Sequence, residues 1–312
     1  MRKKNNLLKD DYSWDLVGIG ASTMDYLVKA PSFPLGREVH EALASARDGG
    51  GPVSTALCAA SRLGARTAML DVIGQDRIGE DILADFDRYG VDTQGIDVLV
   101  GYQSGCAHIL VNGQTGDRAI YFEKSTAPEL THLSEAHKRY IQETAVLHIN
   151  GRHRDVLLEA IAYAHSVGTL VSLDGGADRY SPFLDQVASQ TDICIVALDF
   201  GEKYAGTSDL AQICRYIRQR GSRIAGVTAG ARGSYVIGPD GTEYAIPAYP
   251  VQEVIDSTGC GDSYHGAFLY AFTHGYDVAT CGKIASLVGS MNTQTLGGRS
   301  GLPSLKEVLQ RV

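Results

Sequence analysis

Short apolar runs alternate with helix-length segments along most of the chain. The runs have the length and composition of strands, at residues 15–20, 67–73, 145–149, 169–173, 193–197, 224–228 and 234–237. The helix-length segments lie between them, at residues 53–63, 78–89, 134–143, 154–167, 181–189 and 209–219. Because the first six runs are mostly apolar and show no regular polar alternation, they suit a parallel sheet buried on both faces. The pattern predicts a doubly wound α/β fold, with a mostly parallel sheet and helices on both faces.

Two stretches interrupt this alternation, at residues 26–48 and 102–123. Both are extended with alternating polar positions, and the second contains the turn signals Asn112-Gly113 and Gly116-Asp117. We expect the two stretches to form a small β-sheet lid over one end of the main domain. The organisation expected is one α/β domain over residues 15–312, preceded by an N-terminal tail at residues 1–14.

Composition narrows the class of partner. The 28 Lys and Arg residues against 36 Asp and Glu give a net charge of −8, which argues against nucleic acid or an anionic membrane as the main partner. No run approaches the roughly 18 apolar residues that span a bilayer, and no hydrophobic signal core follows the charged N-terminus. A cytoplasmic location is therefore expected. The six cysteines form no Cys-x-x-Cys pair and are predicted to be reduced thiols.

The sequence Asp256-Ser-Thr-Gly-Cys-Gly-Asp262 opens an apolar helix. The small residues Gly259, Cys260 and Gly261 let peptide N–H groups approach one anion, and the helix N-terminus adds its positive dipole end. Asp262 would stand beside this anion hole, where a carboxylate can take a proton from the hydroxyl that attacks a phosphoryl group. The alternative is that Asp262 only caps the helix.

Polar residues also follow other strands at the edge where α/β sheets bind ligands. Asp25 follows the first strand, and Gly50 and Gly51 precede the helix at residues 53–63. A carboxylate at such a place can accept hydrogen bonds from substrate hydroxyls, although a turn cap is the alternative for Asp25. Arg152 follows the strand at 145–149, where a guanidinium can hold an anionic or hydroxylated substrate or can be ion-paired.

The order of these motifs resembles the ribokinase, or PfkB-type, carbohydrate kinase family from about Asp15 to Pro303. The resemblance rests on five ordered matches, one of which, Ile73–Gly79 with Tyr89–Thr93, is similar to the family's linker helix. The other four are Gly20-Ala-Ser-Thr-Met-Asp25, Gly50-Gly-Pro-Val-Ser-Thr-Ala56, Thr228-Ala-Gly-Ala-Arg-Gly233 and Asp256-Ser-Thr-Gly-Cys-Gly-Asp262. They resemble, in turn, the strand with the substrate aspartate, the first signature, the turn beside the nucleotide phosphates and the second signature. The segment Leu296-Gly-Gly-Arg-Ser-Gly-Leu-Pro303 resembles a subgroup that includes kinases of sulfofructose and similar ketoses.

The resemblance implies an ATP-dependent phosphotransferase that acts on a hydroxyl of a sugar or sugar-like substrate, with Asp262 as general base and Mg²⁺ as cofactor. The acceptor would be bound by Asp25, Gly50, Gly51, Thr55 and Arg152, and the nucleotide by Thr228, Gly230 and Gly233. It also implies a monovalent cation, K⁺, bound by Asp256 and the backbone carbonyl of Thr258, and a homodimer formed through the lid. A nucleoside or a sugar phosphate could replace the sugar as acceptor.

Two departures from the family pattern leave alternatives open. Thr55 stands where the first signature commonly has Asn, so acceptor preference is open. The family's Asn-x-x-Glu motif falls on Ala197 and Phe200, whereas a shifted alignment would use Asp199 and Glu202. A catalytically silent sugar-binding or regulatory protein on the same fold is a different class, and the complete glycine turn with Asp262 argues against it. A Rossmann dehydrogenase is disfavoured because no Gly-x-Gly-x-x-Gly turn follows the first strand.

Overall fold

A mostly parallel β-sheet forms the centre of the computed structural model, which describes residues 6–9, 11–34, 36–37 and 39–311. Its parallel strands are β1 (Trp14–Ile19), β4 (Thr67–Gly74), β9 (Thr144–Ile149), β10 (Leu170–Gly175), β11 (Ile193–Ala197) and β12 (Ile224–Thr228). They are the six runs predicted to be parallel, and their order in the sheet is β12-β11-β10-β9-β1-β4. Their carboxyl ends therefore meet at one edge, which is where the functional residues collect.

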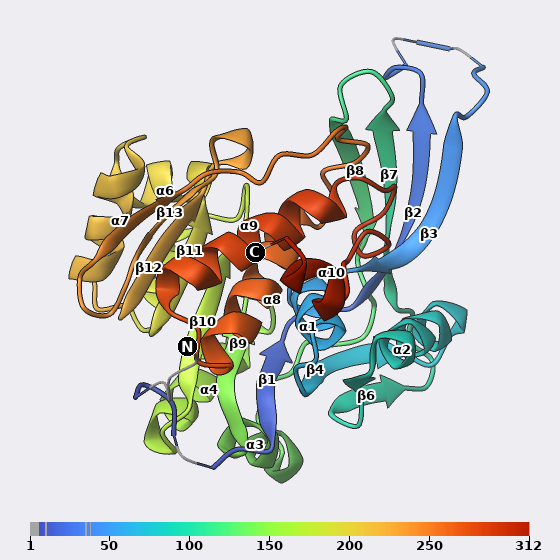
Figure 1. The fold of residues 1–312 in the computed structure, drawn as a ribbon. Coiled ribbons are helices and arrows are strands. Elements are labelled where there is room, and N and C mark those ends of the chain that lie inside the picture. The colour runs from blue at the N-terminus through green and yellow to red at the C-terminus, as the bar shows by residue number, and fades with distance from the viewer. Residues whose placement is uncertain (1–5, 10, 35, 38, 312) are drawn as a thin grey trace.

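Short strands complete the sheet at both sides (Figure 1). They are β13 (Ser234–Ile237) and β14 (Glu243–Ile246) beside β12, and β5 (Val91–Asp92) and β6 (Ile96–Leu99) beside β4. The pairs β12–β13 and β13–β14 are antiparallel, whereas β5 and β6 pair with β4 in parallel. The sequence pattern indicated β13 but not the three other short strands.

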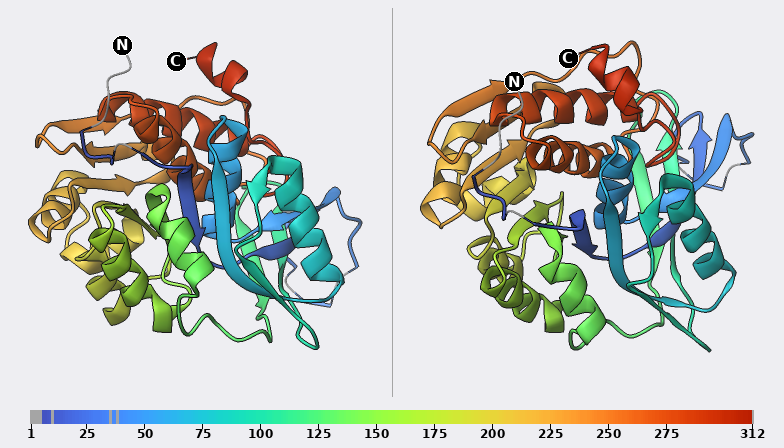
Figure 2. Two further views of the ribbon diagram at one scale, coloured as in Figure 1. Left: turned by 90° about the horizontal axis from the view of Figure 1, so that it is seen from below. Right: turned by 60° about the horizontal axis from the view of Figure 1, so that its bottom comes forward.

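Helices cover both faces of the sheet, as predicted (Figure 2). One face carries α1 (Pro52–Arg62), α2 (Arg77–Tyr89), α8 (Cys260–Thr273), α9 (Val278–Asn292) and α10 (Leu305–Leu309). The other carries α3 (Glu135–Gln142), α4 (Arg154–Ser166), α5 (Pro182–Ala188), α6 (Leu198–Ala205) and α7 (Leu210–Gln219). Alternate residues of β11 enter the two cores: Ile195 lies in the first core, Cys194 and Val196 in the second.

Local sequence explains where many helices begin. Asp76, Ser134, Ser181 and Asp209 each accept a hydrogen bond from a backbone N–H three residues later, which satisfies a donor that the first turn leaves free. The helices α6 and α9 were not anticipated. In α9 most residues are buried, so the apolar positions show no clear helical period.

A second, smaller sheet stands apart from the main body and provides the predicted lid (Figure 1). Its order is β3-β2-β7-β8, formed by β2 (Thr23–Ala30), β3 (Ala44–Gly50), β7 (Gly105–Asn112) and β8 (Arg118–Glu123). The segment before residue 15 was predicted to be a tail. Its residues 1–5 and 10 lie outside the described residues, while Leu8 and Tyr12 pack against the first core.

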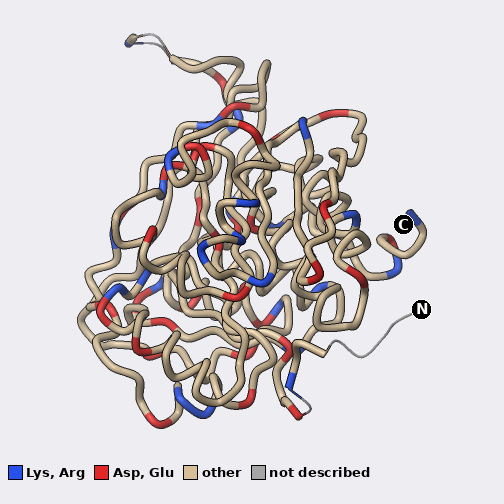
Figure 3. The backbone as a smooth tube through the Cα atoms, turned by 90° about the vertical axis from the view of Figure 1, so that its left-hand side faces the viewer, with Lys and Arg blue, Asp and Glu red and all other residues tan. Residues whose placement is uncertain are grey.

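Charge is distributed without a dominant basic region. Figure 3 shows basic and acidic residues interspersed along the chain. Within the described ranges, no helix combines the length and the apolar character needed to cross a bilayer.

Candidate active site

The glycine-rich loop before α8 has the shape of an anion site. Gly259 is the N-cap of α8 and has a left-handed backbone with φ of 71°. A side chain on Gly259 would clash with the backbone carbonyl of Gly298, whereas one on Gly261 would meet no atom within 4 Å. The backbone N–H of Gly261 interacts with the sulfur of the adjacent Cys260, which is a weak acceptor. The helix N-terminus and this open space can accept a phosphate group.

Asp262 is the third residue of α8, and its side chain does not cap the helix. The capping alternative is therefore wrong. The pKa of Asp262 is raised to about 6, because burial and the carboxylate of Asp174 raise it more than Arg179, His265 and Arg118 lower it. A carboxyl group with a pKa near 6 is well suited to exchange protons close to neutral pH.

A buried charged group that sequence reasoning missed lies next to Asp262. Nε2 of His265, one turn further along α8, lies 3.2 Å from Oδ1 of Asp174 at the carboxyl end of β10. Each side chain is 3% exposed. The ring of His148 lies 5.6 Å from that of His265. Neither histidine was selected from the sequence, because spacing along the chain does not show that α8 crosses β9 and β10.

The pKa values of the two histidines are shifted in opposite directions, although burial lowers both. Burial alone would lower the pKa of His265, but the carboxylate of Asp174 outweighs it and leaves the pKa above its ordinary value. For His148, burial and the charge of His265 together lower the pKa to about 3. His265 is therefore the more readily protonated of the two imidazoles, and His148 is the neutral one.

Asp25 lies inside strand β2 of the lid sheet, not at the end of the first strand as expected. Its carboxyl group is buried and accepts a hydrogen bond from Oγ1 of Thr23 at 3.2 Å, so the turn-cap alternative is wrong. The pKa of Asp25 is raised to about 6, because burial, Asp48 and Asp262 raise it more than Arg299 and the hydrogen bond from Thr23 lower it. The carboxyl groups of Asp25 and Asp262 are therefore close enough to influence one another.

Gly50 and Gly51 leave room for this carboxyl group and for the adjoining loop. A side chain on Gly50 would clash with the carboxyl of Asp25. Gly51 has φ of 92°, and a side chain there would strike the carbonyl of Ala21. Both positions thus need glycine for close approach of β3, β2 and the loop after β1.

Arg299 is a second functional residue that sequence reasoning did not select. Its side chain is 2% exposed, pairs with Asp85, and donates from Nη2 to the carbonyl of Gly50 at 2.7 Å. Its Nε also donates to Oγ1 of Thr55 at 3.1 Å. The hydroxyl of Thr55, predicted to bind the acceptor, is therefore engaged by Arg299. The signal available was the segment Gly297-Gly298-Arg299 itself.

Asp256 joins the anion loop to that same C-terminal segment. It is fully buried, and its Oδ1 accepts from the backbone N and Oγ1 of Thr258 at 2.8 and 2.7 Å. Its Oδ2 accepts from the backbone N of Gly297 at 3.0 Å. No basic side chain pairs with Asp256 among the residues that the structure describes. A buried carboxylate without a counter-charge is a fitting place for a cation.

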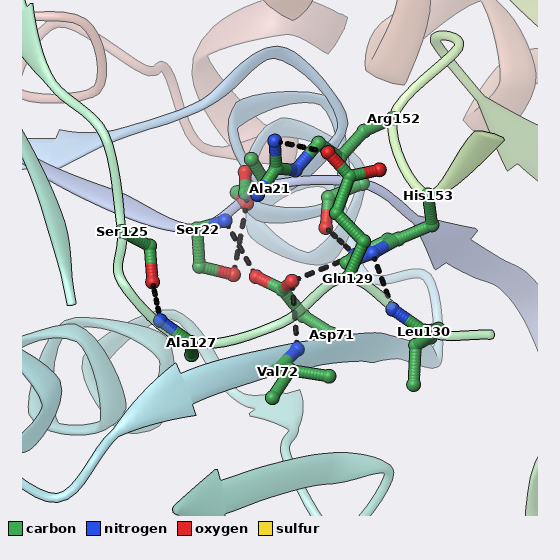
Figure 4. A network of polar contacts seen from close by, with 12 residues as sticks. Ala21, Ser22, Asp71, Val72, Ser125, Ala127, Glu129, Leu130, Arg152 and His153 are labelled. Carbon is green, nitrogen blue, oxygen red and sulfur yellow. Dashed lines mark hydrogen bonds and ion pairs between the residues drawn. The ribbon is translucent and has the colours of Figure 1, made fainter. Parts of the chain in front are cut away.

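Arg152 lies at the rim of the site in a polar network (Figure 4). Its Nη1 donates to Oε1 of Glu129 at 2.6 Å, and its buried Nε has no partner in the described part of the chain. The next residue, His153, accepts from the backbone N of Leu130 through Nδ1, so Nε2 carries the proton and donates to Asp71 at 2.8 Å. This network fixes the start of α4 against the loop after β1.

The predicted nucleotide turn follows β12. Thr228 ends the strand, and the turn is a 3-10 helix at Gly230–Arg232, with φ of 55° at Gly230 and 82° at Gly233. Ser234, next to Gly233, hydrogen bonds the hydroxyl of Tyr264 in α8 at 2.9 Å. The turn therefore lies beside the anion loop.

The structure separates the candidate residues for the family's Asn-x-x-Glu motif. Phe200 is fully buried in the second core, so that register offers no ligand there. Asp199 and Glu202 lie partly exposed on α6, immediately after β11. Oδ2 of Asp199 accepts from the backbone N of Asp178 at 2.6 Å.

The lid also reaches the anion loop directly. Nη1 of Arg118, at the start of β8, donates to Oγ of Ser257 at 2.6 Å. This contact places the Arg118 guanidinium beside the anion loop.

An α/β sheet with a small-sheet lid, and a glycine loop and carboxylate at a helix N-terminus, define the ribokinase-like class of fold. The model of the pfkB family of carbohydrate kinases matches residues 15–305, so the chain belongs to this family. A nucleoside kinase of Methanothermobacter thermautotrophicus is 26% identical over 308 residues, 95% of each chain. A ribokinase of Bacillus subtilis is 25% identical over 300 residues, 93% of this chain and 96% of that one. The structure of Arabidopsis thaliana ribokinase complexed with ribose and ATP is similar with a TM-score of 0.82 at 20% identity, covering 95% of this chain and 97% of that one.

Proposed function

We propose that this protein transfers the γ-phosphoryl group of ATP to a hydroxyl of a sugar or sugar-like acceptor. The observation that carries the proposal is the position of Asp262 beside an open glycine loop at a helix N-terminus. The pKa of its carboxyl group is raised to about 6. Asp262 takes the proton of the acceptor hydroxyl, and the loop amides stabilise charge on the transferred group. The phosphoryl group then moves to the oxygen that has lost its proton.

The acceptor lies between the lid and the loop. Asp25, raised to a pKa of about 6, accepts hydrogen bonds from acceptor hydroxyls beside Gly50 and Gly51. The unpartnered Nε of Arg152 offers a further donor at the rim. Arg299 holds Thr55 and the Gly50 carbonyl in place, so it positions this wall of the pocket.

The nucleotide lies along the turn at Thr228, Gly230 and Gly233, with its terminal phosphate toward Gly261. Mg²⁺ accompanies ATP and is held mainly by phosphates and water, since Mg²⁺ keeps several waters in such sites. Asp199 and Glu202 are the acidic residues placed to contact that water shell. A monovalent cation is bound by Asp256 and the carbonyl of Thr258, which supplies the charge that the buried carboxylate lacks.

The lid joins two copies of the chain in a homodimer. Ile120 and Phe122 lie on one face of β8 and are 49 and 75% exposed, although they are large and apolar. Pairing of two lids would remove this surface from water. We place the dimer in the cytoplasm.

A nucleoside is the second candidate acceptor. The relative from Methanothermobacter thermautotrophicus, a nucleoside kinase, matches 95% of this chain. A nucleoside presents ribose hydroxyls, so Asp25 and Asp262 would act on it in the same way.

Incubation with labelled ATP, Mg²⁺ and a panel of ketoses, aldoses, sugar acids, sugar phosphates and nucleosides tests the proposal. We expect one acceptor class to be phosphorylated with a much higher kcat/KM than the others. A nucleoside as best acceptor would select the second candidate. ATP binding without transfer to any acceptor would indicate a silent sugar-binding protein and overturn the proposal.

A further inference from the structure

Three side chains that can bind a metal meet on one face of the lid sheet. Cys106 and His108 are two residues apart on β7, so both point to the same face. Glu123 on β8 is the antiparallel partner of Cys106. In the described part of the chain, this is the one group of three such residues whose ligand atoms all lie within 4.8 Å of one another.

The distances are close to those of a metal site. Nε2 of His108 lies 2.9 Å from Oε1 of Glu123 and 4.0 Å from Sγ of Cys106. In a tetrahedral zinc site, bond lengths of about 2.0–2.3 Å place ligand atoms about 3.4–3.6 Å apart. Each observed distance differs from this by about half an ångström. The Glu123 side chain is 71% exposed and free to rotate by that amount.

We propose that Cys106, His108 and Glu123 bind a Zn²⁺ ion on the lid. A thiolate and an imidazole favour Zn²⁺ over Mg²⁺ or Ca²⁺, which prefer oxygen ligands. The three residues give one sulfur, one nitrogen and one oxygen ligand, and water completes the tetrahedron. On binding, the ion replaces the proton shared between His108 and Glu123, and the thiol of Cys106 releases its own proton.

The surroundings hold the ligands in place and leave them accessible. The ring of Tyr26, on the neighbouring strand β2, stacks on His108 with centroids 5.5 Å apart and an angle of 18° between the planes. A surface hollow lined by Tyr26, Arg47, His108 and Tyr121 gives a hydrated ion a path to the site. Cys106 is 4% exposed and is the most buried of the three ligands.

The site lies on the opposite face of the lid from Asp25. Asp25 pairs with Ala107, whose side chain points away from those of Cys106 and His108. Zn²⁺ is therefore distinct from the cations of the phosphoryl-transfer site. Because the ion links β7 to β8, it stabilises the strand that carries Arg118 toward Ser257.

The test is metal binding by the full-length protein, freed of metal by a chelator and then desalted. Co²⁺ serves as the spectroscopic probe, and Zn²⁺ is titrated by calorimetry. Nucleotide is left out because ATP binds both ions. We expect one ion per chain, a near-ultraviolet thiolate-to-Co²⁺ band with tetrahedral visible bands, and a higher Tm with Zn²⁺.

Variants distinguish metal binding at Cys106, His108 and Glu123 from metal binding elsewhere on the protein. Cys106→Ser should abolish the thiolate band, and His108→Gln and Glu123→Gln should each weaken Zn²⁺ binding at least about tenfold, since even outer partners of a metal site commonly change affinity by that much. Cys260→Ser and His165→Gln are matched controls and should bind as the wild type does. His108 and Glu123 are exposed, so their variants test the site even if Cys106→Ser does not fold. Absence of a thiolate band in the wild type, or unchanged Zn²⁺ affinity in His108→Gln, would overturn the proposal.

Discussion

His265 and Asp174 form a buried ion pair, 3.2 Å between Nε2 and Oδ1, one helical turn from Asp262. The pair presents opposite charges to the proposed base. The carboxylate of Asp174 raises the pKa of Asp262, and the imidazolium of His265 lowers it with Arg179 and Arg118. A proton acceptor between two opposed charges has its working pH set by both of them.

This arrangement predicts opposite shifts of the pH profile for the two halves of the pair. The base acts unprotonated, so kcat should fall as the pH drops through the pKa of Asp262, about 6. His265→Gln removes a charge that lowers this pKa, so the acidic limb should move to higher pH. Asp174→Asn removes the larger, opposing effect, so the limb should move to lower pH.

The measurement is kcat against pH at saturating substrates, at a temperature where melting shows both variants folded. Breaking a buried pair commonly costs about 3–5 kcal/mol, so both proteins will melt earlier than the wild type. A merely structural pair would lower kcat at every pH and leave both limbs in place.

Asp262→Asn tests the base directly. The amide preserves the shape but accepts no proton, so kcat should fall by about 10²–10⁴-fold. The dissociation constant of ATP should stay within about twofold, because the loop amides are unchanged. Steady-state kinetics and equilibrium nucleotide binding measure the two effects. Near-normal kcat on the best acceptor would remove Asp262 from the mechanism.

Substitutions at two glycines of the anion loop should have different effects, one on stability and the other on ATP binding. Gly259 has φ of 71° and faces the Gly298 carbonyl, so Gly259→Ala should lower stability by at least about 1–2 kcal/mol. Gly261 faces open space, so Gly261→Val should fold with a nearly unchanged Tm but bind ATP weakly, because the side chain fills the phosphate position. Thermal melting and ATP binding distinguish them. Equal ATP affinity in Gly261→Val and the wild type would place the phosphate elsewhere.

Arg152→Ala tests the rim of the acceptor pocket. Loss of a charge-assisted hydrogen bond of about 1.5–3 kcal/mol should raise the acceptor KM roughly tenfold to a hundredfold, with the ATP KM unchanged. Arg154→Ala is the matched control, since the Arg154 guanidinium packs on Phe183 at 4.5 Å and not on Glu129. If both variants behave as the wild type, the Arg152–Glu129 pair only fixes the loops of Figure 4.

The buried charge of Asp256 predicts a requirement for a monovalent cation. In K⁺ buffer both Tm and kcat should exceed their values in choline buffer at equal ionic strength, because the cation neutralises a carboxylate that has no basic partner. Asp256→Asn should lose this difference in Tm. Identical melting in K⁺, Na⁺ and choline would show that hydrogen bonds alone satisfy the carboxylate.

The sequence by itself determined the elements whose signals are local. The six parallel strands follow from apolar runs, the lid from two polar-alternating stretches, and the anion loop from Gly259 to Asp262, because a glycine turn and the helix after it are neighbours in the chain. Each of these depends on contacts within a few residues, which a sequence pattern records directly.

Only the tertiary structure decided which distant charges meet. Arg299 contacts Asp85 and the Gly50 carbonyl from the C-terminal segment, and His265 meets Asp174 where α8 packs over β10. Such pairs depend on how elements cross in space. Burial strengthens the electrostatic interactions of these pairs, because charges removed from water are less screened. The pairs therefore shift the pKa values of neighbouring groups.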